Sequence, residues 1–99
     1  MEKIQVTVDV ELRELIPGFL ENRAKDAVRM EEALERRDYE FLKRLGHSMK
    51  GVGGGYGFDE ITRLGAEIER AAAASDEALL RGLRAQLNEY MQRVAVVYV

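Results

Sequence analysis

Apolar residues recur at intervals of three or four through most of this 99-residue chain, and this period constrains the fold more than any other feature. Four such stretches are separated by residues that begin or end helices. We therefore expect helices over residues 10–37, 39–56, 59–74 and 76–94, in a single domain spanning 1–99. Short connections between amphipathic helices favour an all-α, antiparallel up-down-up-down four-helix bundle.

The expected boundaries depend on capping and helix-breaking residues. Aspartates precede each stretch as candidate N-caps, namely Asp9, Asp38, Asp59 and, after Ser75, Asp76. Pro17 should kink the first helix near its start, or begin the longer part of it, because proline lacks an N–H donor. Gly57 is the expected left-handed residue at the end of the second helix.

The two ends of the chain differ from the helical stretches. In residues 3–8, Ile4, Val6 and Val8 alternate with polar residues, which is the period of a half-buried strand. Residues 94–98 are mostly β-branched or aromatic. The fourth helix of such a bundle ends where the first begins, so we expect these segments to pair as a small antiparallel ribbon.

The segment from Leu45 to Gly57 contains the only histidine of the chain and six of its nine glycines. At about 100° per residue, His47 lies roughly opposite an apolar helical stripe. That stripe is Leu42, Leu45, Met49, Val52 and Tyr56. His47 therefore faces solvent, within about 60° of three cations and with two glycines on its face. The cations are Lys43, Arg44 and Lys50, and the glycines are Gly51 and Gly54.

Glycine inside a helix destabilises it by about 1 kcal/mol relative to alanine, so this run of glycines lowers the stability of the fold. The cost suggests that something approaches this backbone closely. An alternative is that the glycines form a loop and that the helix ends at Met49.

The pattern His47-x-x-Lys50-Gly51, followed by Gly57 and the apolar positions 61, 64 and 68, resembles the histidine-containing phosphotransfer (HPt) domain. The resemblance covers residues 10–95, and residues 45–57 are its most specific part. Three departures are small. Gly46 stands where alanine is common, Met49 where leucine is common, and Gly53–Gly55 are richer in glycine than usual.

The resemblance implies a phosphorelay carrier that accepts a phosphoryl group on His47 from a receiver-domain aspartate or a kinase and passes it to another receiver. Lys50 would then stabilise the phosphoryl group. Gly51 and Gly54 would admit the receiver, and Lys43 and Arg44 would steer its docking. Mg²⁺ is expected in the partner receiver and no cofactor in this chain. No autonomous kinase or hydrolase activity is expected.

The side chains themselves suit this chemistry. An exposed imidazole has a pKa near about 6.5, so at neutral pH it is mostly uncharged and nucleophilic. Phosphoryl transfer depends on in-line positioning and on cations that meet the charge of the equatorial oxygens. Lys50, one helical turn from His47, can reach a phosphoryl group on that ring.

Composition excludes several classes of protein. There are no cysteines and one histidine, so neither a disulfide framework nor a multi-histidine zinc site is possible. A net charge of −3 argues against nucleic acid as the partner. No apolar run approaches a membrane span or a signal core. We therefore expect a cytoplasmic monomer.

Other functions compete with phosphotransfer. A helical protein-interaction module could keep the same bundle without any phosphotransfer role. The glycines of 51–57 could cradle a nucleotide phosphate, but they fit neither the dinucleotide nor the Walker spacing. A kinase dimerisation helix is disfavoured, because no proline follows His47 and no ATP-binding domain is present.

Overall fold

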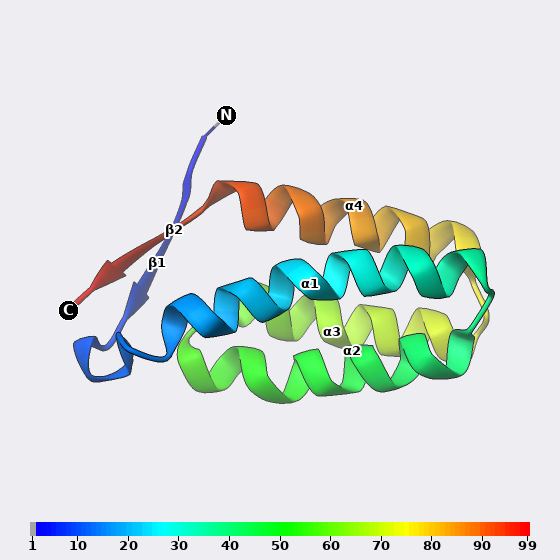
Figure 1. The fold of residues 1–99 in the computed structure, drawn as a ribbon, viewed down its shortest axis with the longest axis horizontal. Helices are drawn as coiled ribbons and strands as arrows, with labels where there is room; N and C mark the ends of the chain where they lie inside the picture. Colours follow the sequence, from blue (N-terminus) through cyan, green and yellow to red (C-terminus); the bar gives the residue numbers. More distant parts are fainter. Residues whose placement is uncertain (1) are drawn as a thin grey trace.

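The structure, a computed structural model, describes residues 2–99. Four helices lie side by side along its long axis, and two short strands cross one end (Figure 1). In chain order the elements are β1 (Ile4–Val8), the 3₁₀ helix η1 (Val10–Leu12), α1 (Ile16–Glu35), α2 (Tyr39–Gly53), the 3₁₀ helix η2 (Gly54–Tyr56), α3 (Asp59–Ala73), α4 (Glu77–Arg93) and β2 (Val94–Tyr98). The expected set of four helices and a terminal ribbon is therefore present.

The expected break near Pro17 is present. Of the two forms predicted for residues 10–37, the structure has a short helix followed by a longer one, because η1 and a turn precede α1, which begins at Ile16. Pro17 lies in the first turn of α1. An N–H in the first turn has no partner inside the helix, so proline costs nothing there. The residue begins the long helix and does not bend it.

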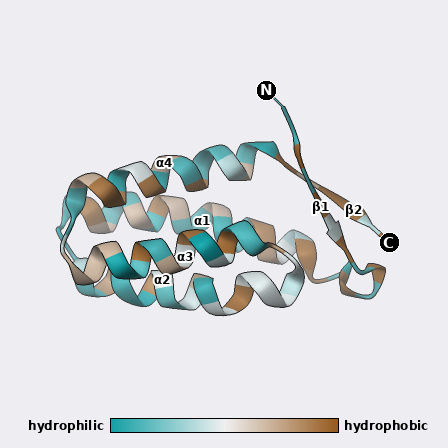
Figure 2. Cartoon of the chain, turned by 180° about the vertical axis from the view of Figure 1, so that it is seen from behind, coloured by the Kyte–Doolittle hydropathy of each residue, from teal (hydrophilic) through white to brown (hydrophobic). Residues whose placement is uncertain are grey.

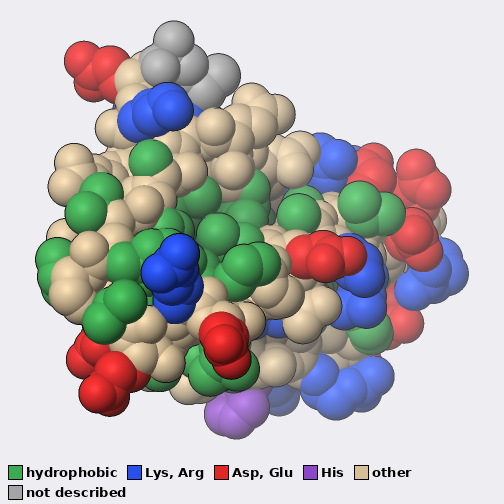
Figure 3. All heavy atoms as spheres, turned by 60° about the vertical axis from the view of Figure 1, so that its left-hand side comes forward, with side chains coloured by type: hydrophobic (Ala, Val, Ile, Leu, Met, Phe, Trp, Pro, Cys, Tyr) green, Lys and Arg blue, Asp and Glu red, His purple; other side chains and the backbone are tan. Residues whose placement is uncertain are grey.

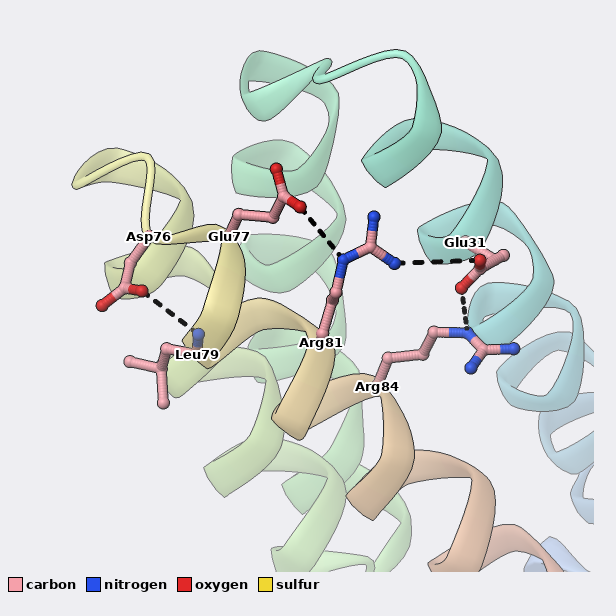
Figure 4. A network of polar contacts seen from close by, with 6 residues as sticks. All are labelled: Glu31, Asp76, Glu77, Leu79, Arg81 and Arg84. Atoms are coloured by element: carbon pink, nitrogen blue, oxygen red, sulfur yellow. Dashed lines mark hydrogen bonds and ion pairs between the residues drawn. The ribbon is translucent and has the colours of Figure 1, made fainter.

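Three of the four predicted aspartate caps are confirmed. Asp9 accepts a hydrogen bond from the Glu11 N–H at 2.9 Å, and Asp38 accepts one from Phe41 at 3.0 Å. The side chain of Asp76 accepts from the Leu79 N–H at 3.1 Å (Figure 4).

The fourth predicted cap, Asp59, is wrong. Phe58 is the N-cap of α3, it forms no side-chain cap, and Asp59 is the first residue of the helix. Phe58 is fully buried, and its N–H bonds to the carbonyl of Gly53 at 2.9 Å. Burial of this ring fixes where α3 begins, and the Asp59 carboxylate is left beside the positive end of the helix dipole.

Among residues 2–99, nineteen apolar residues are buried in one core, which the helices surround and the inner side of β1 helps to close. Hydrophobic and hydrophilic residues alternate around the helices, so each helix presents one apolar side inward (Figure 2). No helix within residues 2–99 is long and apolar enough to cross a membrane.

Ion pairs on the surface tie α4 to α1. Glu31 of α1 lies 3.0 Å from Nε of Arg84 and 3.9 Å from a terminal nitrogen of Arg81 (Figure 4). Arg81 also bonds to Glu77 of its own helix at 3.1 Å. These groups are partly exposed, so the pairs help orient the helices and contribute about 1 kcal/mol or less each.

The terminal strands pair as predicted, but their predicted antiparallel direction is wrong. β1 and β2 are parallel, in a register that runs from Ile4 opposite Val94 to Val8 opposite Tyr98. Our expectation treated β1 as running straight into the first helix. The chain instead reverses through η1 and the turn that follows it, so both strands cross the end of the bundle in the same direction (Figure 1).

Candidate functional site

His47 lies in the middle of α2 with its side chain 70% exposed. The predicted solvent position of this residue is therefore confirmed. The buried stripe of α2 is turned relative to the predicted one and consists of Leu42, Gly46, Met49 and Gly53. Three predicted core positions are only partly buried, namely Leu45, Val52 and Tyr56. The buried side of α2 thus turns toward α3 and brings His47 close to that helix.

Glycines allow α2 and α3 to approach closely. A Cβ atom on Gly46 would lie 2.5 Å from the Glu69 nitrogen and 2.7 Å from the Gly65 oxygen. A Cβ on Gly65 would lie 2.7 Å from the Gly46 oxygen. One on Gly53 would lie 2.6 Å from the Thr62 nitrogen. Backbone atoms occupy these positions, so no larger residue fits unless the helices separate.

This close approach places an acidic side chain beside the histidine. Glu69 lies one turn beyond Gly65 on α3, and its Oε2 is 3.0 Å from His47 Nδ1. Its other oxygen, Oε1, is 2.8 Å from Lys50 Nζ. Glu69 thus joins the histidine and the lysine that were predicted from α2 alone.

Sequence reasoning missed Glu69. A signal for it was present, because Gly65 precedes Glu69 by one turn and an interior glycine marks a close helix contact. The sequence did not show which residues of α2 would contact Gly65. The sequence interpretation also took Gly46 as a small departure from a common alanine, whereas an alanine Cβ at this position would overlap backbone atoms of α3.

The charges of this cluster determine which ring nitrogen is free. The hydrogen bond from Lys50, assisted by that from His47, holds the pKa of Glu69 below its usual value. Glu69 is therefore ionised at neutral pH, and an ionised carboxylate only accepts hydrogen bonds. The proton of the neutral imidazole consequently sits on Nδ1, which donates to Glu69. The lone pair is left on Nε2.

The other predicted cations, Lys43 and Arg44, are exposed on the same side of α2. They line a shallow hollow of about 340 Å³ together with Glu40, His47 and Glu69. The structure therefore brings both cations to the histidine. The hollow also carries two carboxylates, so its charge is mixed and not uniformly positive.

The predicted access glycines differ from each other. Gly51 is exposed in α2, and a Cβ atom there would have no neighbour within 4 Å. Gly54 begins η2, and a Cβ there would be 3.5 Å from Thr62 Oγ1. The alternative of a loop after Met49 is not observed, since α2 continues to Gly53 and the turn ends at Gly57 with φ of +90°.

A family model described as Hpt domain matches residues 14–96. This range contains all four helices and the His47–Glu69–Lys50 cluster. Comparison with curated proteins gave no match. Comparison with solved structures gave none either.

Proposed function

Because the chain belongs to the Hpt domain family, whose members take part in histidine phosphotransfer, we propose that it is a phosphorelay carrier with His47 as its phosphoryl acceptor. The donor is the phospho-aspartate of a receiver domain, or a kinase, and the acceptor that follows is another receiver domain. The observation that carries this proposal is an exposed imidazole whose Nδ1 is hydrogen-bonded to Glu69, which leaves Nε2 open to solvent.

The transfer step requires a nucleophile aligned with the bond that breaks. The lone pair of His47 Nε2 attacks the phosphorus of the aspartyl phosphate opposite the aspartate oxygen. The N–P bond forms as that P–O bond breaks, and the aspartate leaves as a carboxylate. The ring keeps its Nδ1 proton and gains positive charge, which the Glu69 carboxylate stabilises at 3.0 Å. Onward transfer is the same step in reverse, with a second receiver.

Lys50 supplies a cation for the phosphoryl group. Its ammonium is held by Glu69 at 2.8 Å, one helical turn from His47. A phosphoryl group on Nε2 offers three oxygens to this ammonium, so Lys50 can exchange part of its contact with Glu69 for a contact with the phosphate. This interaction stabilises the phosphorylated state.

The surroundings of the site suit a docking partner. Lys43 and Arg44 attract the acidic pocket of a receiver and increase the rate of encounter, as complementary charges do. Gly51 leaves open space one turn beyond His47. Mg²⁺ for the reaction belongs to the receiver, and the chain acts as a carrier without kinase or hydrolase activity of its own.

Incubation with phosphorylated receiver domains tests the proposal. We expect phosphate that is labile in acid and stable in base, mapped by mass spectrometry to His47. Phosphate on any other residue, or none from any phosphorylated receiver or histidine kinase tried, would favour the interaction-module alternative.

The substitution His47→Gln separates a chemical role from a structural one. The side chain is 70% exposed, so its replacement leaves no cavity, and the free energy of unfolding should change by about 0.5 kcal/mol or less. Phosphate uptake should be abolished. A large fall in melting temperature would instead identify His47 as a structural residue.

A further inference from the structure

The strand β2 is apolar on both faces, although only one face is covered. Residues 94–99 read Val-Ala-Val-Val-Tyr-Val, with neither a charge nor a proline. Val94, Val96 and Tyr98 pack against the core, whereas Val97 and Val99 are 41% and 71% exposed. In β1 the corresponding outward positions are polar, namely Gln5 and Thr7. Continuous apolar sequence is typical of strands that are enclosed, and β2 is not enclosed by its own chain.

Within residues 2–99, one edge of β2 also carries backbone groups that no hydrogen bond pairs. The Val99 N–H bonds to the Val8 carbonyl at 3.0 Å, and the Val99 carbonyl accepts from Val10 at 2.8 Å. In a parallel pair every second residue of a strand bonds to the same neighbour, so residues 95, 97 and 99 face β1. The N–H and C=O of Val96 and Tyr98 therefore point away from β1, along the free edge.

The opposite edge of the ribbon, on β1, is partly covered. A Cβ atom on Gly57 would lie 3.4 Å from the Thr7 carbonyl, so the turn before α3 lies against that edge. Natural sheets protect open edges with charges, prolines or bulges, and β2 lacks the first two.

We propose that the free edge of β2 pairs with β2 of a second copy of this chain, giving a four-stranded sheet in the order β1-β2-β2-β1. The two β2 strands run antiparallel about a two-fold axis at Val97. In this register the groups of Val96 bond to those of Tyr98 in the other copy, and the two Val97 side chains lie side by side. The Val94 N–H is not needed, because it already bonds to the Tyr90 carbonyl at the end of α4.

A second copy fits this edge better than a charged or polar partner. Every β2 side chain that would face its counterpart across the two-fold axis is uncharged and all but Tyr98 are aliphatic, so the paired strands themselves bring no like charges together. Hydrophobic side chains gather at this end of the molecule (Figure 3), where Val10 is also 48% exposed. His47 is in the middle of α2, so the pairing leaves both phosphotransfer sites accessible.

The mass in solution tests the pairing directly. Light scattering or sedimentation should give a mass that rises toward twice 11.2 kDa with concentration. Because two short strands make a small contact, we expect a weak dimer and a series from about 10 µM to about 1 mM. A wild-type chain that stays at 11.2 kDa throughout that series would overturn the proposal.

Two substitutions test the register. Val96→Pro removes an outward N–H and should give a monomer with unchanged helical circular dichroism, since proline is tolerated on a free edge. Val97→Lys keeps the inner face of β2 and should also give a monomer. If Val96→Pro does not fold, the oligomeric state of Val97→Lys tests the assignment of the edge. A dimer that persists in either folded variant would overturn the assignment of the edge.

Cross-linking adds a test of the two-fold axis. The chain has no cysteine, so Val97→Cys introduces a single thiol that should form a disulfide-linked dimer under mild oxidation. Val28→Cys is the matched control, because Val28 is 58% exposed but lies on α1. Preferential cross-linking at residue 97 supports the proposal, and equal cross-linking at both positions contradicts it.

Discussion

At the scale of single residues, the suitability of His47 depends on a carboxylate from another helix. An isolated surface imidazole exchanges its proton between two ring nitrogens. Glu69 removes this ambiguity, since its ionised carboxylate accepts from Nδ1 at 3.0 Å and leaves the lone pair on Nε2, the atom that we propose as the nucleophile. The hydrogen bond from Lys50 is the chief cause of the lowered pKa of Glu69, so this carboxylate is ionised at neutral pH and can only accept from the ring.

The substitution Glu69→Gln should weaken this control of the ring. The amide can donate as well as accept, so the Nδ1–H form of His47 is no longer enforced. We expect phosphate uptake to slow about tenfold, the effect of losing a hydrogen bond to a charged group. ¹⁵N NMR of the imidazole should show a smaller population of the Nδ1–H form.

The control for that change is Glu67→Gln. Glu67 lies on the same helix but pairs with Arg70 at 3.0 Å, away from the histidine. The Glu67→Gln substitution should leave both the rate of phosphate uptake and the ¹⁵N spectrum of the imidazole unchanged. Equal rates and equal tautomer populations in the Glu69→Gln protein and the parent would exclude a positioning role for Glu69.

Lys50→Ala and Arg44→Ala should affect different steps. Lys50 lies beside the proposed phosphoryl site, so its loss should slow transfer even at saturating receiver. Arg44 is expected to act on encounter, so its loss should lower the association rate and the dependence of that rate on salt. Stability should change by about 0.5 kcal/mol or less in each case. An encounter rate independent of ionic strength would contradict the steering role.

At the scale of helices, the glycines of this chain have two different uses. Gly46, Gly53 and Gly65 face the contact between α2 and α3, where an added Cβ would meet backbone atoms. Gly51 is open to solvent. The first group fixes the distance between the two helices, and thereby the contact of Glu69 with His47. Gly51 remains as the residue that we propose admits a partner.

Alanine substitutions distinguish these uses. Gly51→Ala should stabilise the protein by about 0.5–1 kcal/mol, because it reduces the backbone entropy lost on folding, and should lower the transfer rate by obstructing the receiver. Gly46→Ala should destabilise it by about 1–3 kcal/mol, since α2 and α3 must separate. Denaturant unfolding and transfer kinetics measure both effects. A Gly51→Ala protein that is more stable and fully active would show that Gly51 does not serve partner access.

At the scale of the whole molecule, the terminal ribbon joins the first and last segments of the chain. β1 leads into α1 through η1, and β2 continues directly from α4. The inner side chains of both strands pack on the end of the core, and Val8 among them is 2% exposed. The ribbon therefore closes the end of the bundle at which α1 begins and α4 ends.

Truncation after Arg93 should lower the free energy of unfolding by about 2–4 kcal/mol, from the loss of three partly buried apolar side chains and the exposure of Val8. Phosphate uptake at His47 should persist, because α2 and α3 are untouched. Val97→Thr is the control, since it keeps the inner face of β2, and it should change stability by about 0.5 kcal/mol or less. Dilute samples avoid a contribution from dimerisation. A truncated chain as stable as the parent would mean that the ribbon adds nothing to the fold.

The sequence by itself determined the features that depend on neighbours along the chain. Apolar spacing placed the four helices, and aspartates at 9, 38 and 76 marked helix starts because a cap bonds within its own turn. The rotation of about 100° per helical residue placed His47 on the solvent side of its helix, near Lys43, Arg44 and Lys50. Alternation revealed β1, and β-branched residues revealed β2. In each case the interacting groups are separated by only a few residues.

The tertiary structure alone decided the features that depend on how distant elements meet. The direction of the ribbon was set by the reversal through η1, which a strand pattern does not encode. The contact of Glu69 with His47 joins residues 22 apart, and it required the α2–α3 register fixed where Gly46 meets Gly65. The spacing of apolar residues along the sequence determines which side of a helix is buried. The packing of specific side chains determines which residues of the neighbouring helix that side contacts. For that reason the exposed position of His47 was predictable from the sequence, and the Glu69 carboxylate that meets its ring was not.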